Sequence, residues 1–221
     1  GAGSPEPALS FVRGTMVDAG VTVIASDAPL GEEGYEVVCA ADDAPEVLDT
    51  LLVRGLNSAP FGYRTWDALT LEAGTPLFEY ELAGRIPNVA GVRNALDFEK
   101  GCYVGQEVVS KVENRGRPSQ RLIGLRLDAD GGTVPGAGST VFDAEDGAIG
   151  AVTRVVESPV VGEPIALAFV DFEASAERPS GSEGPSLTVG LDDSAVDAAA
   201  VALPFVEGSA VTARLPTYPE A

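Results

Sequence analysis

The stretch AIGAVTRVVESPVVGEPIALAFVD, residues 148–171, consists of two apolar runs joined by a turn that carries proline and glycine. Short apolar and β-branched runs bounded by Gly, Pro and Asp are typical of β-strands. Four more runs of this kind lie in the C-terminal half: RLIGLRLD (121–128), STVFDAE (139–145), SLTVGLD (186–192) and AAAVALP (198–204). Six such runs at fairly even spacing predict an antiparallel barrel or sandwich.

The N-terminal half mixes strand and helix patterns. The predicted strands are VTVIAS (21–26) and GYEVVCA (34–40), and the predicted helices are DDAPEVLDTLLVRG (42–55) and GYRTWDALTLEAG (62–74). The first helix has Pro45 in its first turn and Asp42 or Asp43 as its cap. Its expected apolar face is Val47, Leu48, Leu51 and Leu52. The order strand, strand, helix, helix favours an α+β fold over an alternating α/β fold.

A polar, turn-rich segment, VENRGRPSQ (112–120), separates the two halves. We therefore expect one domain over residues 1–112 and a β-barrel domain over residues 118–216. Within the second domain, EASAERPSGSEGPS (173–186) has the composition of a flexible insertion.

The chain is strongly acidic: its 221 residues include 14 basic and 34 acidic side chains, a net charge of −20. Such a surface repels nucleic acid and anionic lipid, whose recognition depends on Lys and Arg. No run approaches the roughly 18 uninterrupted apolar residues of a membrane span. Acids spread along the whole chain are typical of adaptation to molar salt, where charges are screened within about 3 Å. An acidic partner-binding surface is the alternative, and the first explanation predicts a halophilic protein.

Cys39 and Cys102 are the two cysteines, and the chain has no histidine. This set excludes a disulfide framework, a zinc site made by this chain alone and a histidine general base. We expect no bound metal, two reduced thiols and a cytoplasmic location. Cys39 ends an apolar strand run and is predicted to pack in the core.

The stretch DFEKGCYVGQE (97–107) holds one of the two cysteines and one of the two lysines. The thiolate is the reactive form of cysteine, and a nearby cation favours it. Lys100 and Cys102 are two residues apart and share one face if the backbone is extended. The other motif residues can shape a tight turn, form hydrogen bonds or begin a helix: Gly101, Gly105, Gln106 and Glu107. On these grounds alone, a packing role for Cys102 beside an aromatic ring stays open.

The run KGCYVGQE (100–107) resembles the signature of YgfZ-type folate-binding proteins. These belong to the glycine-cleavage T-protein (aminomethyltransferase) superfamily and assist iron–sulfur cluster assembly or repair. Other stretches similar to that superfamily are GEEGYEV (31–37), APFGYRTWDALTLEAGTPLFEYEL (59–82), IPNVAGVRNALDFEKGCYVGQE (86–107), RLIGLRL (121–127) and LPFVEGSAVTARLP (203–216). The resemblance implies part of a folate-binding body, with ferredoxin-like strands and helices, followed by an antiparallel β-barrel. It also implies that a further N-terminal segment of the same protein completes the tetrahydrofolate site.

The resemblance also implies roles for single residues. Cys102 and Lys100 would be the reactive pair, with Gly101, Gly105, Gln106 and Glu107 shaping or fixing the loop. The implied folate contacts are Glu36, Tyr103 and Arg64. Aminomethyltransferases lack the motif cysteine, and they carry an arginine where this chain has Trp66. Arg64 lies two residues earlier, and such a shift turns a helical side chain by about 200°.

Three functions follow as alternatives, and they leave open whether the protein is an enzyme. The first is a tetrahydrofolate-binding accessory factor for iron–sulfur proteins or their assembly machinery, with Cys102 as a transient thiol. Because clusters normally need about four cysteine ligands, any cluster contact would be shared with another chain. The second is aminomethyl or methyl transfer involving tetrahydrofolate, with Glu36 holding the pterin; the Trp66 departure counts against it. The third is a folate-binding module without catalysis.

Overall fold

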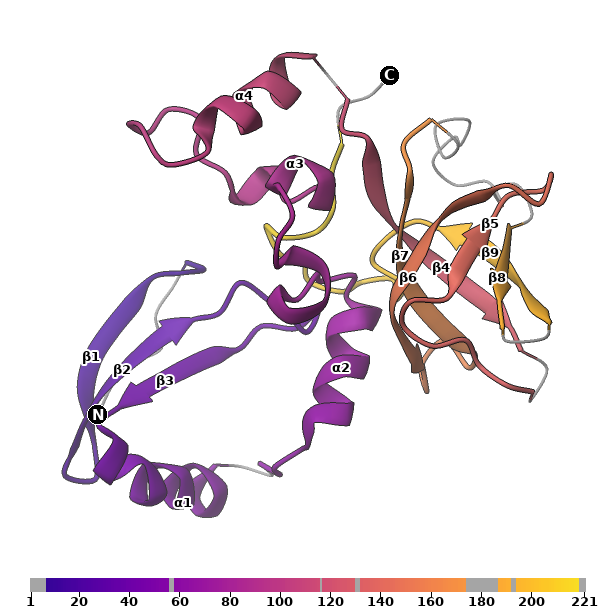
Figure 1. The fold of residues 1–221 in the computed structure, drawn as a ribbon. Coiled ribbons are helices and arrows are strands. Elements are labelled where there is room, and N and C mark those ends of the chain that lie inside the picture. The colour runs from indigo at the N-terminus through magenta and orange to yellow at the C-terminus, as the bar shows by residue number, and fades with distance from the viewer. Residues whose placement is uncertain are drawn as a thin grey trace.

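The computed structural model describes residues 7–55, 58–115, 117–129, 132–173, 187–191 and 194–218. Figure 1 shows a mixed N-terminal part beside a β-barrel, with helix α2 between them. The N-terminal part begins with three antiparallel strands in the order β1-β2-β3. Its elements are β1 (Phe11–Met16), β2 (Ala19–Ala25), β3 (Tyr35–Cys39), η1 (Ala41–Asp43), α1 (Ala44–Arg54), α2 (Tyr63–Glu72), η2 (Phe78–Leu82), α3 (Pro87–Ala90), η3 (Arg93–Ala95) and α4 (Gln106–Arg115).

The three-stranded sheet has one packed face and one open face. Val21 is paired with Cys39 across β2 and β3, and cross-strand partners lie on the same face. Both contribute to a small apolar cluster with Val47 of α1, in which Cys39 is half-buried. Ile24 is paired with Glu36 on the opposite face, and Glu36 is exposed there. The sheet therefore presents Glu36 on the side away from α1.

Helix α1 has nearly the expected bounds but a different buried face. Pro45 lies in its first turn and Val47 is buried, as predicted. The Asp43 side chain makes no capping hydrogen bond. Leu48 and Leu51 are 55% and 37% exposed, so the prediction that they face the core is wrong. A sheet of three short strands is too narrow to cover the whole apolar face of the helix.

The C-terminal part is a closed barrel of antiparallel strands in the order β4-β7-β6-β5-β8-β9. Strand β4 pairs with both β7 and β9, which closes the barrel around fully buried side chains such as Leu125, Val141 and Val170. The strands are β4 (Gln120–Asp128), β5 (Thr140–Phe142), β6 (Ala148–Glu157), β7 (Pro164–Asp171), β8 (Leu187–Gly190) and β9 (Ala195–Val201). Each of the six predicted runs overlaps one of these strands, although β9 begins three residues before the run predicted at 198–204. The predicted α+β fold with an antiparallel barrel is confirmed.

Strand β7 is buried on both faces and joins the barrel to the helices. Ala166 belongs to the barrel core, whereas Ile165 and Leu167 belong to a second cluster with Leu71 of α2 and Leu122 of β4. A strand that is covered on both faces has a continuously apolar sequence rather than an alternation of apolar and polar residues. That burial accounts for the unbroken apolar character of this strand in the sequence.

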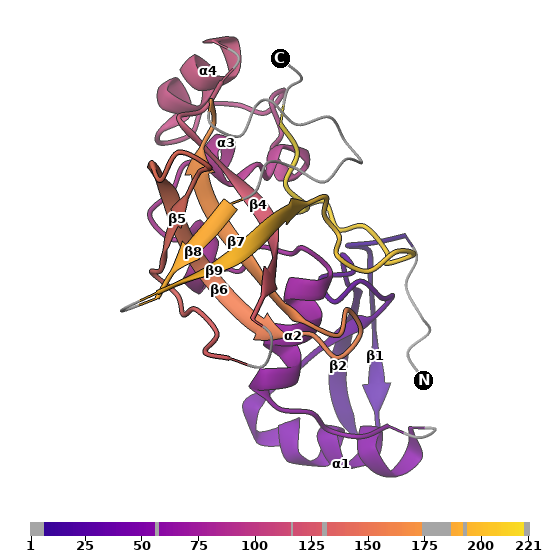
Figure 2. The ribbon, with the colours of Figure 1, turned by 90° about the vertical axis from the view of Figure 1, so that its right-hand side faces the viewer.

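The C-terminal segment, residues 203–218, runs from the barrel past the sheet and back to α3 (Figure 2). The Ala210 backbone N–H donates to the Gly31 carbonyl at 2.7 Å, in the connection between β2 and β3. The Thr212 hydroxyl donates to the Asp27 carboxylate at 2.6 Å. These bonds hold the sheet against a segment that starts at the barrel, and so they fix the two parts relative to each other.

Strand β1 was not predicted, because Arg13 and Gly14 interrupt the apolar pattern of FVRGTM. Of the expected flexible insertion, residues 174–186 lie outside the described part of the chain. Among the described helices, none is both long and apolar enough to span a membrane.

Candidate functional site

The KGCYVGQE motif forms the turn that leads into α4. The Tyr103 backbone N–H donates to the Gln106 side-chain oxygen at 3.1 Å. Gly105 has a φ of +89°, a conformation that strains residues with a Cβ. Glu107 lies in the first turn of α4, where the helix dipole favours a carboxylate. A Cβ at Gly101 would meet no atom within 4 Å, so the fold itself gives no steric reason for glycine at that position.

The exposed groups of this turn are an amine, a thiol and aromatic rings. Lys100 Nζ lies 4.9 Å from the centre of the Tyr103 ring, a cation–π contact. Cys102 is a free, exposed cysteine. A cavity of about 330 Å³ lies under the turn, and its lining includes Arg85, Asp97, Phe98, Lys100, Tyr103 and Val108. Lys100 and Tyr103 thus border a small recess, while the Cys102 thiol is open to solvent.

Helix α4 is tied to the rest of the N-terminal part along its inner face. Arg93 forms an ion pair with Glu113 at 2.6 Å. The Asn88 side-chain amide donates to the Val109 carbonyl at 3.4 Å, and Val109 is buried. The helix and the motif turn therefore form a lobe with a fixed inner side and an exposed outer side.

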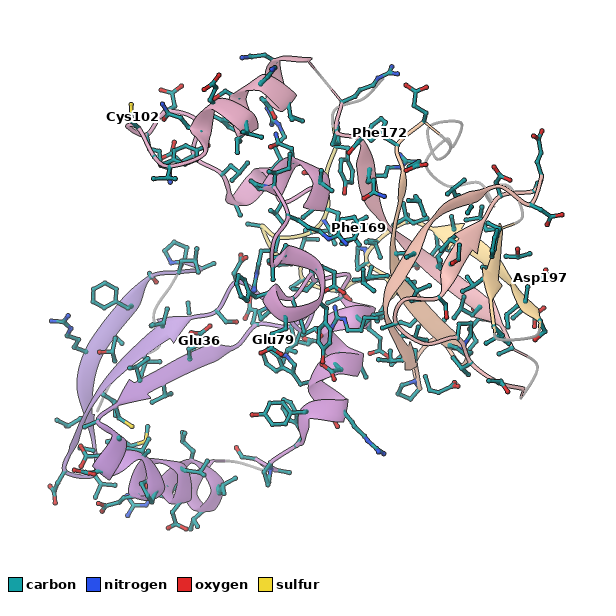
Figure 3. All side chains as sticks on the ribbon, viewed as in Figure 1. Glu36, Glu79, Cys102, Phe169, Phe172 and Asp197 are labelled. Carbon is teal, nitrogen blue, oxygen red and sulfur yellow. The ribbon has the colours of Figure 1, made fainter. Side chains whose placement is uncertain are left out.

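The residues expected to contact folate are not gathered around the motif. Glu36 points away from the face that carries Tyr35 and Val37, as the strand alternation predicts. Arg64 is exposed in the first turn of α2. Figure 3 shows Cys102 at the tip of the turn before α4 and Glu36 on the sheet, well apart. The structure brings Lys100, Tyr103 and Gln106 together, but it leaves Glu36, Arg64 and Cys102 on three separate elements.

A buried polar cluster between α2, η2 and β6 was not predicted. Arg154 of β6 donates to the Thr70 hydroxyl at 2.7 Å and to the Thr75 carbonyl at 2.9 Å. Its Nη2 lies 3.4 Å from Glu81 Oε2, and Glu81 is fully buried. Thr153 donates to the other Glu81 oxygen at 2.9 Å. A β-bulge in β6 allows the neighbours Thr153 and Arg154 to reach one carboxylate.

Burial dominates the electrostatics of this cluster. It lowers the pKa of Arg154 below the usual value, since removal from water disfavours the guanidinium ion, and the Glu81 charge opposes that shift. Arg154 Nε has no hydrogen-bond partner among the described residues. The sequence gives one indication of this cluster: Arg154 lies inside an apolar strand pattern, which indicates a buried charge with a partner. No sequence pattern identifies which residue that partner is. The cluster links the barrel to the helices and holds their relative position.

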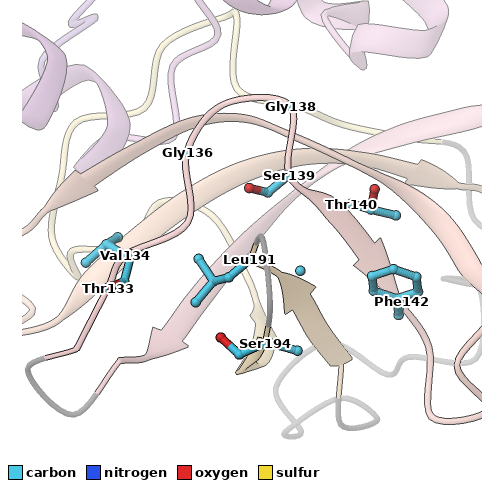
Figure 4. Close-up of a pocket in the computed structure, with 11 residues that line it drawn as sticks. Thr133, Val134, Gly136, Gly138, Ser139, Thr140, Phe142, Leu191 and Ser194 are labelled. Atoms are coloured by element: carbon cyan, nitrogen blue, oxygen red, sulfur yellow. The ribbon is translucent and has the colours of Figure 1, made fainter.

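A larger cavity, about 780 Å³, opens between the β4–β5 connection and the β8–β9 turn (Figure 4). Its described lining is uncharged and includes the hydroxyls of Thr133, Ser139, Thr140 and Ser194 and the apolar side chains of Phe142 and Leu191. The cavity contains none of the predicted site residues.

Both the barrel and the chain as a whole are similar to known proteins. Residues 120–207 match the family described as glycine cleavage T-protein C-terminal barrel domain. An aminomethyltransferase of Cutibacterium acnes is 34% identical over 87% of this chain and 50% of its own length. One from Saccharopolyspora erythraea is 35% identical over 81% of this chain and 48% of its own length.

A solved structure has the same fold over most of this chain. It is the glycine cleavage system aminomethyltransferase T from Bartonella henselae, with a TM-score of 0.72 and 25% identity. The similarity covers 87% of this chain and 51% of that one. The chain thus spans about half the length of the curated relatives that it matches.

Proposed function

Because this chain belongs to the glycine-cleavage T-protein superfamily, we propose that it binds tetrahydrofolate and takes part in aminomethyl transfer, the reaction for which its relatives are named. The observation that carries the proposal is similarity that extends beyond the barrel to 87% of the chain. Since the chain spans about half of those relatives, binding and transfer are proposed for the complete natural polypeptide that contains it.

Glu36 is the residue that we assign to the pterin. It is exposed on the open face of the sheet, and an ionised carboxylate forms strong, charge-assisted hydrogen bonds with N–H donors such as those of a pterin ring. Arg64 and Tyr103 stay proposed folate contacts. They lie on α2 and on the motif turn, so one folate molecule would have to extend between elements to reach either of them from Glu36.

We expect Glu36→Gln to weaken tetrahydrofolate binding about 10- to 100-fold, because the charged acceptor is lost while the side-chain size is kept. Calorimetric titration of the complete natural polypeptide in molar KCl measures the change. Glu33→Gln is the matched control, since Glu33 is an exposed acid just ahead of β3. Equal weakening in both variants would remove the assignment of Glu36. No binding by the unmodified protein would remove the folate proposal itself.

Aminomethyl transfer is tested separately, by the glycine-cleavage reaction with a lipoyl carrier protein. The feature that counts against transfer is Trp66, half-buried in α2 where aminomethyltransferases carry arginine. Turnover above background supports transfer. Tetrahydrofolate binding without turnover would exclude aminomethyl transfer and leave a folate-binding accessory factor or a folate-binding module without catalysis.

A second candidate is supported by the motif. It is a YgfZ-type, folate-binding accessory factor for iron–sulfur proteins, in which the exposed Cys102 is the working thiol. Lys100 stays the proposed partner of Cys102 in this candidate, and its ammonium lies over the Tyr103 ring. The supporting observation is the intact KGCYVGQE run, which aminomethyltransferases lack. The names of the relatives support the transferase reading more than this one.

Under the second candidate, we expect Cys102→Ser in the complete polypeptide to lower the activities of cluster-containing enzymes in cells. Cys39→Ser should leave them unchanged, because Cys39 is half-buried beside the α1 cluster. The measurement is the activity of several iron–sulfur enzymes in a strain that carries each variant as its sole copy. Unchanged activities with Cys102→Ser would eliminate this candidate.

A further inference from the structure

We propose that the turn between β5 and β6 holds a latent modification site, the Asp146–Gly147 bond, which Asp143 protects from isomerisation to isoaspartate. The site involves no ligand. It goes beyond both proposed functions, because it concerns the chemical durability of the barrel.

The first observation is the residue pair itself. Asp–Gly pairs are the most prone to this reaction, because glycine has no side chain to hinder the approach of its nitrogen to the neighbouring carboxyl group. The sequence has two such pairs, Asp130–Gly131 and Asp146–Gly147. The first lies outside the described residues, and the second lies in the turn that joins β5 to β6.

The reaction needs no partner other than water. The Gly147 nitrogen attacks the carboxyl carbon of the Asp146 side chain, a C–N bond forms, and the nitrogen's proton leaves with the carboxyl OH as water. The product is a cyclic imide. Water then breaks the bond between the nitrogen and the original main-chain carbonyl. The main chain now runs through the former side chain and contains one additional methylene group.

The second observation is that burial does not protect this bond. Asp146 is exposed, so water reaches its carboxyl group. Its φ is +60°, a left-handed conformation that aspartate adopts more readily than most residues. Any protection in the folded protein must therefore come from hydrogen bonds that hold the peptide in place.

The third observation is a set of hydrogen bonds that all involve Asp143. Its Oδ1 accepts the Gly147 N–H and the Glu145 N–H, both at 2.9 Å. Its backbone N–H donates to the Gly147 carbonyl at 3.0 Å, and its carbonyl accepts the Asp146 N–H at 3.2 Å. A Cβ on Gly147 would lie 3.0 Å from Asp143 Oδ2, so the carboxylate lies directly against this glycine. Asp143 thus binds Gly147 through both its N–H and its carbonyl.

These bonds oppose the attack. The electrons of the amide nitrogen lie above and below the peptide plane, so the peptide must rotate before the nitrogen can face the carboxyl carbon. That rotation breaks the bond from the Gly147 N–H to Asp143, a charged acceptor that holds it more strongly than a neutral one. The reaction therefore proceeds only from an opened turn.

The protected turn matters for closure of the barrel. Strand β5 has three residues and pairs with both β6 and β8. Its central residue, Val141, is fully buried in the barrel core. Because turn type and loop length set the register of a hairpin, an additional main-chain methylene in this turn disturbs the pairing of β5 with β6.

Incubation of the folded, complete natural polypeptide at neutral pH tests the proposal. Mass spectrometry with electron-transfer fragmentation then measures isoaspartate separately at Asp130 and Asp146. We expect isomerisation of Asp146 to be at least about tenfold slower in the folded protein than in the same protein unfolded in urea. Asp143→Ala should raise the folded-state rate at least about tenfold, because hydrogen bonds to a charged acceptor are lost.

Two variants and one internal reference serve as controls. Asp143→Asn keeps an acceptor oxygen and should recover most of the protection. Glu145→Ala removes a charge from the same turn and should change the rate by less than about twofold. The rate at Asp130 should also stay within about twofold in every variant, since unfolding of the whole barrel would accelerate both sites.

Three results would overturn the proposal. One is an equal rate at Asp146 in the folded and the urea-unfolded protein. Another is a slower reaction in Asp143→Ala, since Asp143 would then act as the base that removes the Gly147 proton. The third is equal acceleration of Asp130 and Asp146 in Asp143→Ala, which would assign the protection to the fold as a whole.

Discussion

Glu81→Ala is expected to lower the free energy of unfolding by about 3–5 kcal/mol, the typical cost of breaking a buried ion pair from one side. The Glu81 carboxylate is fully buried and accepts hydrogen bonds from the Leu77 N–H at 2.8 Å and the Thr153 hydroxyl at 2.9 Å. Its loss leaves the Arg154 guanidinium, 5% exposed, without its ion-pair partner, and Asp67 is then the nearby carboxylate whose charge still favours the cation. Chemical denaturation followed by circular dichroism measures the change.

The matched control for Glu81 is Glu163→Ala. Glu163 pairs with Arg126 on the barrel surface, where the two side chains are 33% and 50% exposed. Solvent screens such a pair, so its loss should cost less than about 1 kcal/mol. A similar small effect for Glu81→Ala would show that the buried cluster does not stabilise the junction between the barrel and the helices.

Tyr218→Phe is expected to have the second large effect, a fall of about 2–3 kcal/mol in the free energy of unfolding at neutral pH. The Tyr218 hydroxyl donates to the Val89 carbonyl at 2.8 Å and accepts from the Leu122 N–H at 2.6 Å. Without the hydroxyl, the Val89 carbonyl on α3 and the Leu122 N–H on β4 lose this hydrogen-bond partner. The ring itself is closely packed, since a Cβ on Gly91 would lie only 2.7 Å from it.

The same residue predicts a pH dependence. Burial raises the pKa of Tyr218 well above its usual value of about 10, while the Leu122 N–H and the Arg121 charge oppose the shift. Above about pH 10 the unfolded chain loses the phenolic proton and the folded chain keeps it. The unfolded state then binds fewer protons, so stability falls by about 1.4 kcal/mol per pH unit. Below about pH 10 this contribution is fully present.

The free energy of unfolding, measured from about pH 9 to about pH 11.5, checks this dependence of stability on pH. Tyr218→Phe should lose it, and the difference from the unmodified protein isolates the contribution of Tyr218. Tyr63→Phe, at a tyrosine 88% exposed, should retain the slope of the unmodified protein. An unchanged slope in Tyr218→Phe would assign the alkaline loss of stability to other groups.

Short-range patterns predicted much of the fold. The barrel strands could be predicted because each is a short apolar run bounded by turn residues, and β7 because burial on both faces left it continuously apolar. The apolar pattern was less informative for elements that are covered on only one face. Strand β1 was missed, and Leu48 was placed in the core although it is 55% exposed.

The candidate site could be predicted only in part. The KGCYVGQE run indicated a turn before a helix, and the structure has Gln106 closing that turn at the start of α4. The sequence also indicated Glu36 on a strand facing away from Tyr35 and Val37. It could not show whether these residues share one site, because that depends on how the sheet and the α4 lobe pack.

By itself, the sequence determined the types and order of most strands, the helices α1 and α2, and the family resemblance, because periodicity, turn residues and motifs are local properties of the chain. Only the tertiary structure decided which distant residues meet. Arg154 and Glu81 are 73 residues apart and share a buried cluster, whereas Glu36 and Cys102 lie on separate elements. The physical reason is that such contacts depend on the packing of whole elements, here through β7, α2 and the C-terminal segment, and no local pattern encodes that packing.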